Sequence, residues 1–267
     1  MTPRAARWER VAQRDNPSWY LDPLVARQKA ELHLELARRW AGGGEPARVL
    51  KTDVFEDAYG DDHLLADLLP GARCRIGIDV APTTIRRARS RCAVESICFL
   101  AADVRSLPLR PGSVDVIFSN STLDHFDSAE EFRRALAELA TVLRPGGRLI
   151  ITLDNLRNPL YFLLRAASRL RCTPFHLGHT TSQAGLVNAL EEAGLEVIDR
   201  GTLIHNPRVV STALFLILRG LLGRRADGPI GAALRLFAGL EHLPTRQLTA
   251  CFVSACAWKP VAPPPAA

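Results

Sequence analysis

The sequence lacks the patterns that mark metal-binding, disulfide-linked and secreted proteins. It has no CxxC pair, and no histidine lies at zinc-ligand spacing from two of its six cysteines. No metal site is therefore expected, and the cysteines, most of which have apolar neighbours, are expected to be buried free thiols. The N-terminus has no apolar stretch of the kind that a secretory signal contains, so the cytoplasm is the expected location.

Long apolar runs and lysine are also scarce. The most apolar segment, Val209–Leu222, is shorter than the ~20 apolar residues of a membrane-spanning helix and is interrupted by Arg219, so no stable membrane insertion is expected. The net charge of +6 comes almost entirely from arginine, a usage typical of GC-rich bacterial genes. The arginines are scattered and form no basic stripe interleaved with aromatics, so nucleic acid is not expected as a partner.

What is present is the composition of a soluble α/β protein, with 47% hydrophobic residues and 23% charged residues. Short apolar runs rich in β-branched residues predict strands, and a helical pattern lies between the first two. The strands are predicted at Arg75–Val80, Ser96–Leu100 and Val114–Phe118, and the helix at Pro82–Ser90. A strand–helix–strand order predicts a parallel sheet, in which ligands bind beyond the carboxyl ends of the strands.

Polar side chains follow each of these predicted strands, namely Asp79, Asp103 and Asn120. A carboxylate at the position of Asp79 can accept hydrogen bonds from both hydroxyls of a ribose. Asp103 follows two alanines that leave room for a flat ring, and it could accept a hydrogen bond from an exocyclic amine. The alternative is that both acids are helix N-caps or solvated loop residues, but their joint spacing favours a nucleoside site.

These motifs together resemble the nucleotide-binding half of the class I S-adenosylmethionine-dependent methyltransferases. The family has an acid at the end of its second strand (Asp79) and another after its third (Asp103). It also has an LP segment before the fourth strand, here Leu107-Pro108, and the sequence LRPGGRLIIT before the fifth, here Leu143–Thr152. The resemblance covers roughly residues 46–200 and implies S-adenosyl-L-methionine as the cofactor.

The resemblance implies an α/β fold with a Rossmann-like, mostly parallel seven-stranded sheet and flanking helices. It divides the chain into an N-terminal helical extension or lid (1–45), the cofactor-binding core (46–200), C-terminal helices inserted before a final strand (201–258), and a disordered tail (259–267). In the extension, Trp19 and Tyr20 are candidates for the pocket lining, although simple packing is favoured. For Val209–Leu222 we expect a helix packed against the sheet; a homodimer contact and a groove for a lipid-like substrate are the alternatives.

The chain departs from the family after its first predicted strand, Pro46–Lys51. The family has an acid and a glycine-rich loop there, whereas this sequence has Lys51, then Asp53 and Phe55 where glycines are usual. Glycine permits close backbone approach, so this loop must take another path. Either it binds the cofactor through Thr52, Asp53 and Glu56, which we favour, or the domain is a non-catalytic nucleoside-binding or regulatory protein.

The resemblance places the cofactor on nine residues: Thr52, Asp53, Glu56, Asp79, Val80, Asp103, Val104, Asn120 and Ser121. Methyl transfer needs a base only if the acceptor must lose a proton, and the candidates are His125, His176 and His179, with Asp124 weaker. For each histidine a purely structural role is the competing interpretation.

The expected reaction is therefore methyl transfer to a small-molecule acceptor, possibly an apolar one. The sequence lacks the Cys-Pro-Pro and Asn/Asp-Pro-Pro-Tyr motifs of the common nucleic-acid methyltransferases. A nicotinamide-dependent oxidoreductase is disfavoured, because no GxGxxG follows the first predicted strand.

Overall fold

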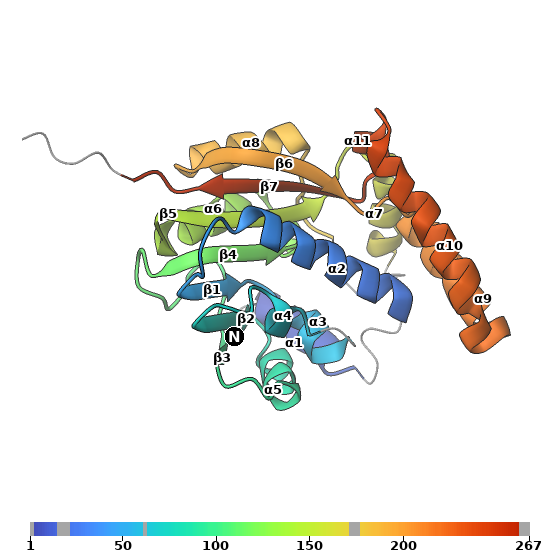
Figure 1. Cartoon of the computed structure of the whole chain (residues 1–267), viewed down its shortest axis with the longest axis horizontal. Coiled ribbons are helices and arrows are strands. Elements are labelled where there is room, and N and C mark those ends of the chain that lie inside the picture. Colours follow the sequence, from blue (N-terminus) through green and yellow to red (C-terminus); the bar gives the residue numbers. More distant parts are fainter. Residues whose placement is uncertain (1–2, 15–21, 61–62, 171–176, 262–267) are drawn as a thin grey trace, which may run out of the picture.

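The computed structural model describes residues 3–14, 22–60, 63–170 and 177–261. Its centre is a seven-stranded sheet with the order β3-β2-β1-β4-β5-β7-β6, in which only the pairs made by β7 are antiparallel (Figure 1). The strands are β1 (Arg48–Lys51), β2 (Cys74–Asp79), β3 (Ile97–Ala101), β4 (Val114–Asn120), β5 (Leu143–Asp154), β6 (Glu196–Leu203) and β7 (Phe252–Trp258). The predicted α/β fold with a mostly parallel sheet is confirmed.

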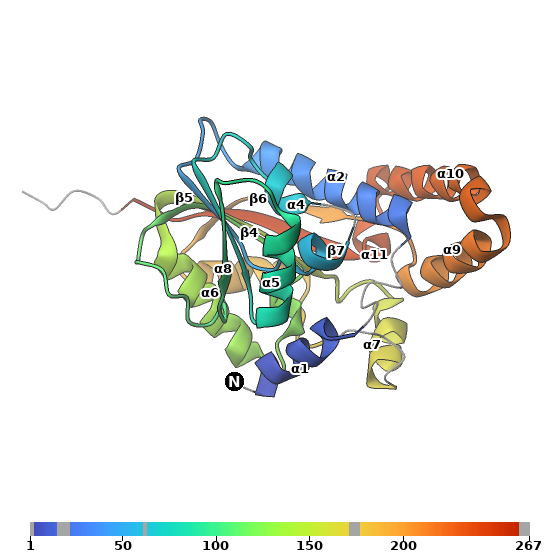
Figure 2. The same ribbon diagram turned by 90° about the horizontal axis from the view of Figure 1, so that it is seen from below.

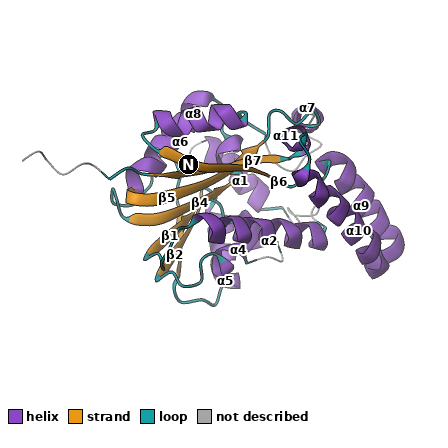
Figure 3. Cartoon of the chain, turned by 45° about the horizontal axis from the view of Figure 1, so that its top comes forward, coloured by secondary structure: helices purple, strands orange, loops and turns teal. Residues whose placement is uncertain are grey.

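Helices cover both faces of the sheet (Figure 3). One face carries α6 (Ala129–Val142) and α8 (Gln183–Glu192), and the other carries α2 (Pro23–Trp40), α3 (Phe55–Tyr59), α4 (Leu64–Asp67) and α5 (Pro82–Arg91). The remaining helices are α1 (Pro3–Ala12), α7 (Tyr161–Arg169), α9 (Arg208–Leu222), α10 (Asp227–Ala238) and α11 (Arg246–Thr249), with short 3-10 turns η1 (Leu123–His125), η2 (Gly223–Ala226) and η3 (Gly239–His242).

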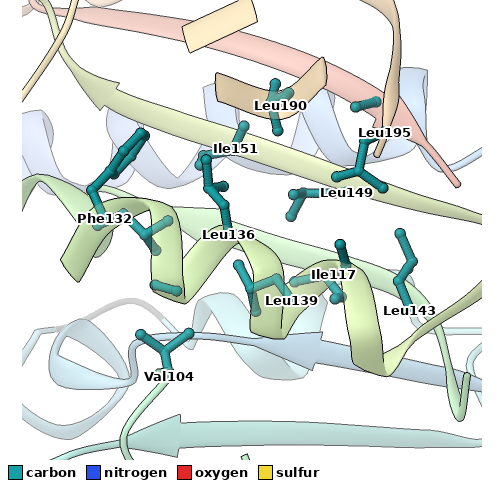
Figure 4. Close-up of a cluster of buried hydrophobic side chains, with 14 of the residues drawn as sticks. Val104, Ile117, Phe132, Leu136, Leu139, Leu143, Leu149, Ile151, Leu190 and Leu195 are labelled. Carbon is teal, nitrogen blue, oxygen red and sulfur yellow. The ribbon is translucent and has the colours of Figure 1, made fainter. Parts of the chain in front are cut away.

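The largest part of the core lies between the sheet and α6. The helix begins after Ser128, whose Oγ accepts a hydrogen bond from Glu131 N at 3.2 Å and so caps the first turn. Its apolar face buries Leu136 and Leu139 completely against β4 and β5 (Figure 4). Burying one such side chain stabilises the fold by roughly 1.5–3 kcal/mol.

The chain between β1 and β2 forms two short helices, α3 and α4. Asp57 of α3 links them to β1, because its carboxylate accepts hydrogen bonds from Lys51 Nζ at 2.9 Å and from Leu65 N of α4 at 2.7 Å. Strand β6 pairs with β7 from Glu196 to Leu203, with a register shift between Val197 and Asp199. The predicted disordered tail begins too early, because Lys259 N donates to Gly147 O at 3.0 Å; residues 262–267 lie outside the described part.

The expectation that Val209–Leu222 packs against the sheet is also wrong. The sheet faces are already covered, and the buried side of α9 packs instead on α10 and η2, where Phe215 meets Ala226, Ile230 and Leu234. Leu24 of α2 packs against the edge of this small cluster. Among the residues that the structure describes, no helix is both long and apolar enough to cross a membrane.

The cysteines are less uniformly buried than expected. Cys251 and Cys256 are buried free thiols, but Cys98 is exposed and Cys74 and Cys92 are half-buried. Cys98 is exposed because β3 is an edge strand, whose alternate residues face solvent. Cys172 lies outside the described residues.

Candidate functional site

A cavity lies at the carboxyl ends of β1 to β4, where the parallel topology brings the strand ends together. Six of the predicted cofactor residues and one predicted base line it: Thr52, Asp53, Asp79, Val80, Asp103, Val104 and His125. The rest of the lining is Arg4, Trp8, Phe55, Thr84, Ala102 and Thr122. The apolar members provide surfaces for a flat ring, and the carboxylates provide hydrogen-bond acceptors.

Asp79 is the last residue of β2 and is 9% exposed. Its Oδ1 accepts a hydrogen bond from Ala81 N at 2.7 Å, so the acid also orders the start of α5, as the alternative interpretation anticipated. Burial and the neighbouring Asp53 carboxylate raise the pKa of Asp79 to about 8. A carboxylate in this position is stabilised by any ligand that donates hydrogen bonds to it, as the two hydroxyls of a ribose would.

The loop after β1 is shaped by an ion pair in place of glycines. The side chain of Lys51 is fully buried, its Nζ lies 2.9 Å from Asp57 Oδ2, and it also donates to the carbonyl of Asp53. Asp57 Oδ1 accepts from Leu65 N at 2.7 Å, and Asp53 Oδ1 accepts from Phe55 N at 2.8 Å. The lysine therefore points away from the cavity, and Asp53 remains in its lining. Burial raises the pKa of Asp53, and the Lys51 ammonium partly opposes this.

Glu56, which was predicted to contact the cofactor, contacts another part of the protein instead. It is absent from the described lining of the cavity and forms an ion pair with Lys29 of α2. Burial would raise the pKa of Glu56, but the Lys29 and Lys51 ammonium groups outweigh burial and lower it to about 2. This carboxylate is already neutralised within the protein, so the structure gives no support to its proposed contact with a cofactor.

Asp103 lies in the cavity wall beside Ala102 and is held by Arg105. Arg105 Nη2 donates to Asp103 Oδ2 at 2.6 Å, and Arg105 N donates to Oδ1 at 3.0 Å. Burial raises the pKa of Asp103, but these hydrogen bonds and the nearby Arg4 guanidinium lower it overall. Asp103 is therefore a carboxylate of fixed orientation, suited to accept from an amine in the cavity.

Helix α1 closes one side of the cavity and was not predicted. The Arg4 guanidinium lies 3.7 Å from the centre of the Phe126 ring, and the Trp8 ring lies 5.0 Å from that of His125. Glu9 accepts from Thr83 N at 3.1 Å, which ties α1 to α5 (Figure 2). The spacing of Ala5, Trp8, Val11 and Ala12 is a helical signal that could have revealed this element. Trp19 and Tyr20 lie outside the described residues.

Asn120 and Ser121 are absent from the described lining of the cavity. Ser121 has φ of 47°, so the chain turns sharply after β4, and its Oγ donates to Asp124 Oδ2 at 2.8 Å. Asn120 is 5% exposed at the end of β4. Both residues act here as parts of the turn that directs η1 across the strand ends, and a cofactor contact for either stays a prediction.

Of the proposed bases, only His125 lines the cavity. It is half-buried, and its charge would act on the carboxylates of Asp53 and Asp154. His179 instead lies with its ring 5.8 Å from that of Phe132, and burial together with Arg133 and Arg165 lowers its pKa. Asp124 is 1% exposed and accepts hydrogen bonds from Ser121 Oγ and from Asp154 N at the end of β5, which indicates a structural role. His176 lies outside the described residues.

The segment that contains Gly178 and His179 supports η1 from outside. Gly178 N donates to Asp124 O at 2.9 Å, and His179 N donates to Phe126 O at 2.5 Å. A Cβ on Gly178 would lie 1.9 Å from Phe126 O, so only glycine allows this close approach. The segment therefore fixes the backbone on which His125 is carried.

We predict that Gly178→Ala displaces η1. The added methyl must move backbone atoms, so we expect a loss of stability of about 1–3 kcal/mol and a weaker cofactor affinity. Thermal melting and ligand titration measure the two effects. Gly228→Ala in α10 is the matched control, since its Cβ would meet no atom within 4 Å, and it should leave both values near those of the wild type. Equal behaviour of the two variants would contradict the role given to Gly178.

A second polar cluster adjoins His125 at the ends of β4 and β5. Asp154 is 1% exposed and forms an ion pair with Arg208 at the start of α9. In this cluster, three buried oxygens have no hydrogen-bond partner among the described residues: Asn120 Oδ1, Asp124 Oδ1 and Asp154 Oδ2. Burial and the charges of Asp154 and Asp124 raise the pKa of Tyr161. Sequence reasoning missed Asp154 and Arg208, because the pairing joins residues that are far apart in the chain.

Residues 58–151 match a family model described as a methyltransferase domain. The match begins after β1 and its unusual loop, and it covers β2, β3, β4 and most of β5. The resemblance to class I S-adenosylmethionine-dependent methyltransferases is thereby confirmed.

The chain is 37% identical over 108 residues to malonyl-[acyl-carrier protein] O-methyltransferase of Methylococcus capsulatus, covering 40% of this chain and 37% of that protein. It is 29% identical over 163 residues to the chloroplastic tocopherol O-methyltransferase of Arabidopsis thaliana, covering 54% and 44%. The chain thus spans less than half the length of either relative. The structure of N-methyltransferase NodS from Bradyrhizobium japonicum with S-adenosyl-l-homocysteine has a TM-score of 0.58 at 18% identity, covering 96% of this chain and 98% of that one, which shows a shared fold.

Proposed function

We propose that the chain is an S-adenosylmethionine-dependent methyltransferase that acts on a small-molecule acceptor. The observation that carries this proposal is the cavity in which Asp79 and Asp103, at the ends of adjacent strands, face the same space as His125. It lies in a domain that matches the methyltransferase family.

The residues present fit the cofactor by their chemistry. Asp79 would accept from the ribose hydroxyls, and Asp103 with Val104 would hold the adenine. Thr52 and Asp53, at the end of β1, would face the positively charged amino acid part. When bound, S-adenosylmethionine supplies an electrophilic methyl group; the chain supplies orientation, and His125 is the group placed to remove a proton from a hydroxyl or amine.

Two observations support a small and partly apolar acceptor. The two relatives described above are named for malonyl-[acyl-carrier protein] and for tocopherol, neither of which is a nucleic acid. A small cluster of Tyr161, Leu164 and Leu177 provides buried apolar surface near Asp154 and Asp124, the acids that adjoin His125.

The alternative is a nucleoside-binding protein without catalysis. Lys51, in the place of the usual acid, is the observation that favours it. Against it, the buried Lys51–Asp57 pair leaves the cavity open and keeps Asp53 in the lining.

Calorimetric titration with S-adenosylmethionine and S-adenosylhomocysteine tests the proposal first. We expect micromolar binding of both, followed by transfer of a radiolabelled methyl group to a member of a panel of phenols, quinols, amines and acyl carboxylates. If the folded protein binds neither nucleoside, the proposed activity is refuted and only the assignment of the fold stands.

The affinity for S-adenosylhomocysteine should depend on pH through Asp79. Because the pKa of Asp79 is raised to about 8, the carboxyl is protonated below that pH, and a ribose diol binds the ionised form. Affinity should therefore rise with pH and level off above about 8, and it should be about 100-fold weaker at two pH units below the pKa. Titrations from pH 6 to 9 measure this. Asp79→Asn should bind weakly with a flat profile; an equally steep profile in that variant would assign the effect to another group.

A further inference from the structure

Helix α9 carries an exposed apolar stripe that the fold does not use. Val210, Leu214, Ile217 and Leu221 recur at helical spacing and therefore share one side of the helix. They are 57%, 49%, 59% and 77% exposed, whereas Phe215 on the other side is 1% exposed. Isolated exposed leucines are ordinary, but a continuous stripe of this length marks an interaction surface.

Helix α7 adds to this surface. It contacts α9, and its Phe162 and Leu170 are 67% and 75% exposed, while Tyr161 and Leu164 turn inward to their own cluster. Figures 1 and 2 show both helices beyond the carboxyl ends of β4 and β5, away from the sheet. We call the exposed side chains of the two helices, Phe162, Leu163, Leu170, Val210, Leu214, Ile217 and Leu221, the α7–α9 apolar face.

The two chain segments that form this face carry arginines and no acidic residue. Although the chain has 28 acidic residues, none occurs in residues 155–190 or 200–226, the two segments that contain α7 and α9. Arg165 and Arg169 on α7 are exposed, as are Arg224 and Arg225 after α9. Arg208 and Arg219 are excluded from this set, because they pair with Asp154 and with Asp22 and Asp227.

We propose that the α7–α9 apolar face binds the surface of an anionic lipid bilayer. An apolar helix side in segments that carry exposed arginines and no acid is the pattern of a helix that lies in the interfacial region, with its apolar side chains in the acyl boundary and its arginines on the headgroup phosphates. A second copy of the chain fits less well, because a symmetric contact would bring the arginines of both copies together. The binding is peripheral, in keeping with the absence of a spanning helix among the described residues.

The position of the face connects it to the site. The first residue of α9, Arg208, pairs with Asp154 at the end of β5, and the first residue of α7, Tyr161, lies close enough to Asp154 and Asp124 for their charges to raise its pKa. A bilayer on this face would therefore lie near the polar cluster of Asp124 and Asp154, which adjoins His125. The inference does not depend on methyl transfer, since it concerns binding of the whole chain to lipid.

Vesicle flotation of the full chain tests the proposal. We expect the protein to float with vesicles of phosphatidylcholine mixed with phosphatidylglycerol, and to remain below vesicles of phosphatidylcholine alone. Ile217→Ser combined with Leu221→Ser should weaken binding by about tenfold or more, since two exposed apolar side chains are lost. The matched control is Val94→Ser combined with Ile198→Ser, at side chains 40% and 47% exposed elsewhere on the molecule, and it should float like the wild type.

Two flotation results would overturn the proposal: the wild type fails to float with anionic vesicles, or both double variants float equally well. A third result would assign the face to a dimer instead. In that case the wild type sediments as a dimer, only the α9 double variant is a monomer, and no protein floats. Melting curves should match for all variants, because each altered side chain is exposed. If the protein floats but binds neither nucleoside, the lipid-binding proposal stands and the methyltransferase proposal fails. The failure of one proposal can therefore be told from the failure of the other.

Discussion

Asp79→Ala should weaken binding of S-adenosylhomocysteine by about 100-fold or more, because two hydrogen bonds to an ionised carboxylate are together worth about 3 kcal/mol or more. The protein should remain folded. The variant loses the hydrogen bond to Ala81 N, but it also loses a carboxylate whose pKa is raised to about 8 by burial and by Asp53. Calorimetry at pH 8 or above, where wild-type Asp79 is ionised, measures the change in affinity.

The sign of the stability effect follows from the same pKa. The folded protein holds the Asp79 proton up to about pH 8, whereas the unfolded chain releases it near 3.8, so Asp79 lowers stability progressively as the pH rises between these values. The Asp79→Ala variant lacks this pH-dependent loss of stability. Its melting temperature should therefore fall less between pH 5 and pH 8 than the melting temperature of the wild type. Asp67→Ala, at an exposed acid on α4, is the control and should change neither property. Wild-type affinity in Asp79→Ala would refute the ribose assignment.

His125→Ala should lower the turnover number by about 10²- to 10⁴-fold, the usual contribution of a general base, with little change in cofactor affinity. His125 is the only proposed base in the described cavity lining, and it faces the strand ends between Asp53 and Asp154. The measurement is methyl transfer to the acceptor found in the panel, with S-adenosylhomocysteine binding measured in parallel.

His179→Ala is the matched control, because this histidine packs near Phe132 and is absent from the described lining. It should retain turnover within a few-fold of the wild type if its contribution is only packing. Unchanged turnover in His125→Ala would exclude it as the base, whereas a parallel loss of cofactor affinity and turnover would give it a binding role instead.

The sequence by itself determined the strands and the acids at their ends. Short runs of β-branched residues predict strands, and such runs are a local property of the sequence. The strands β2, β3 and β4 lie within one or two residues of their predicted positions. The carboxyl ends of parallel strands lie at the same edge of the sheet, so a parallel topology implies that Asp79 and Asp103 are close together. The N-cap of α6 at Ser128 is equally local, because it needs only the serine hydroxyl and the backbone N–H three residues further on.

Only the tertiary structure decided which polar groups are available to a ligand. Glu56 is neutralised by Lys29 of α2, and the N-terminal residues Arg4 and Trp8 complete a cavity whose other walls begin at Thr52. Asp154 meets Arg208, and the exposed side of α9 is set by the cluster that buries its other side. Each of these contacts joins segments that local patterns treat as independent. Their pairing depends on how the helices pack around the sheet, and that packing belongs to the whole chain rather than to any short stretch of it.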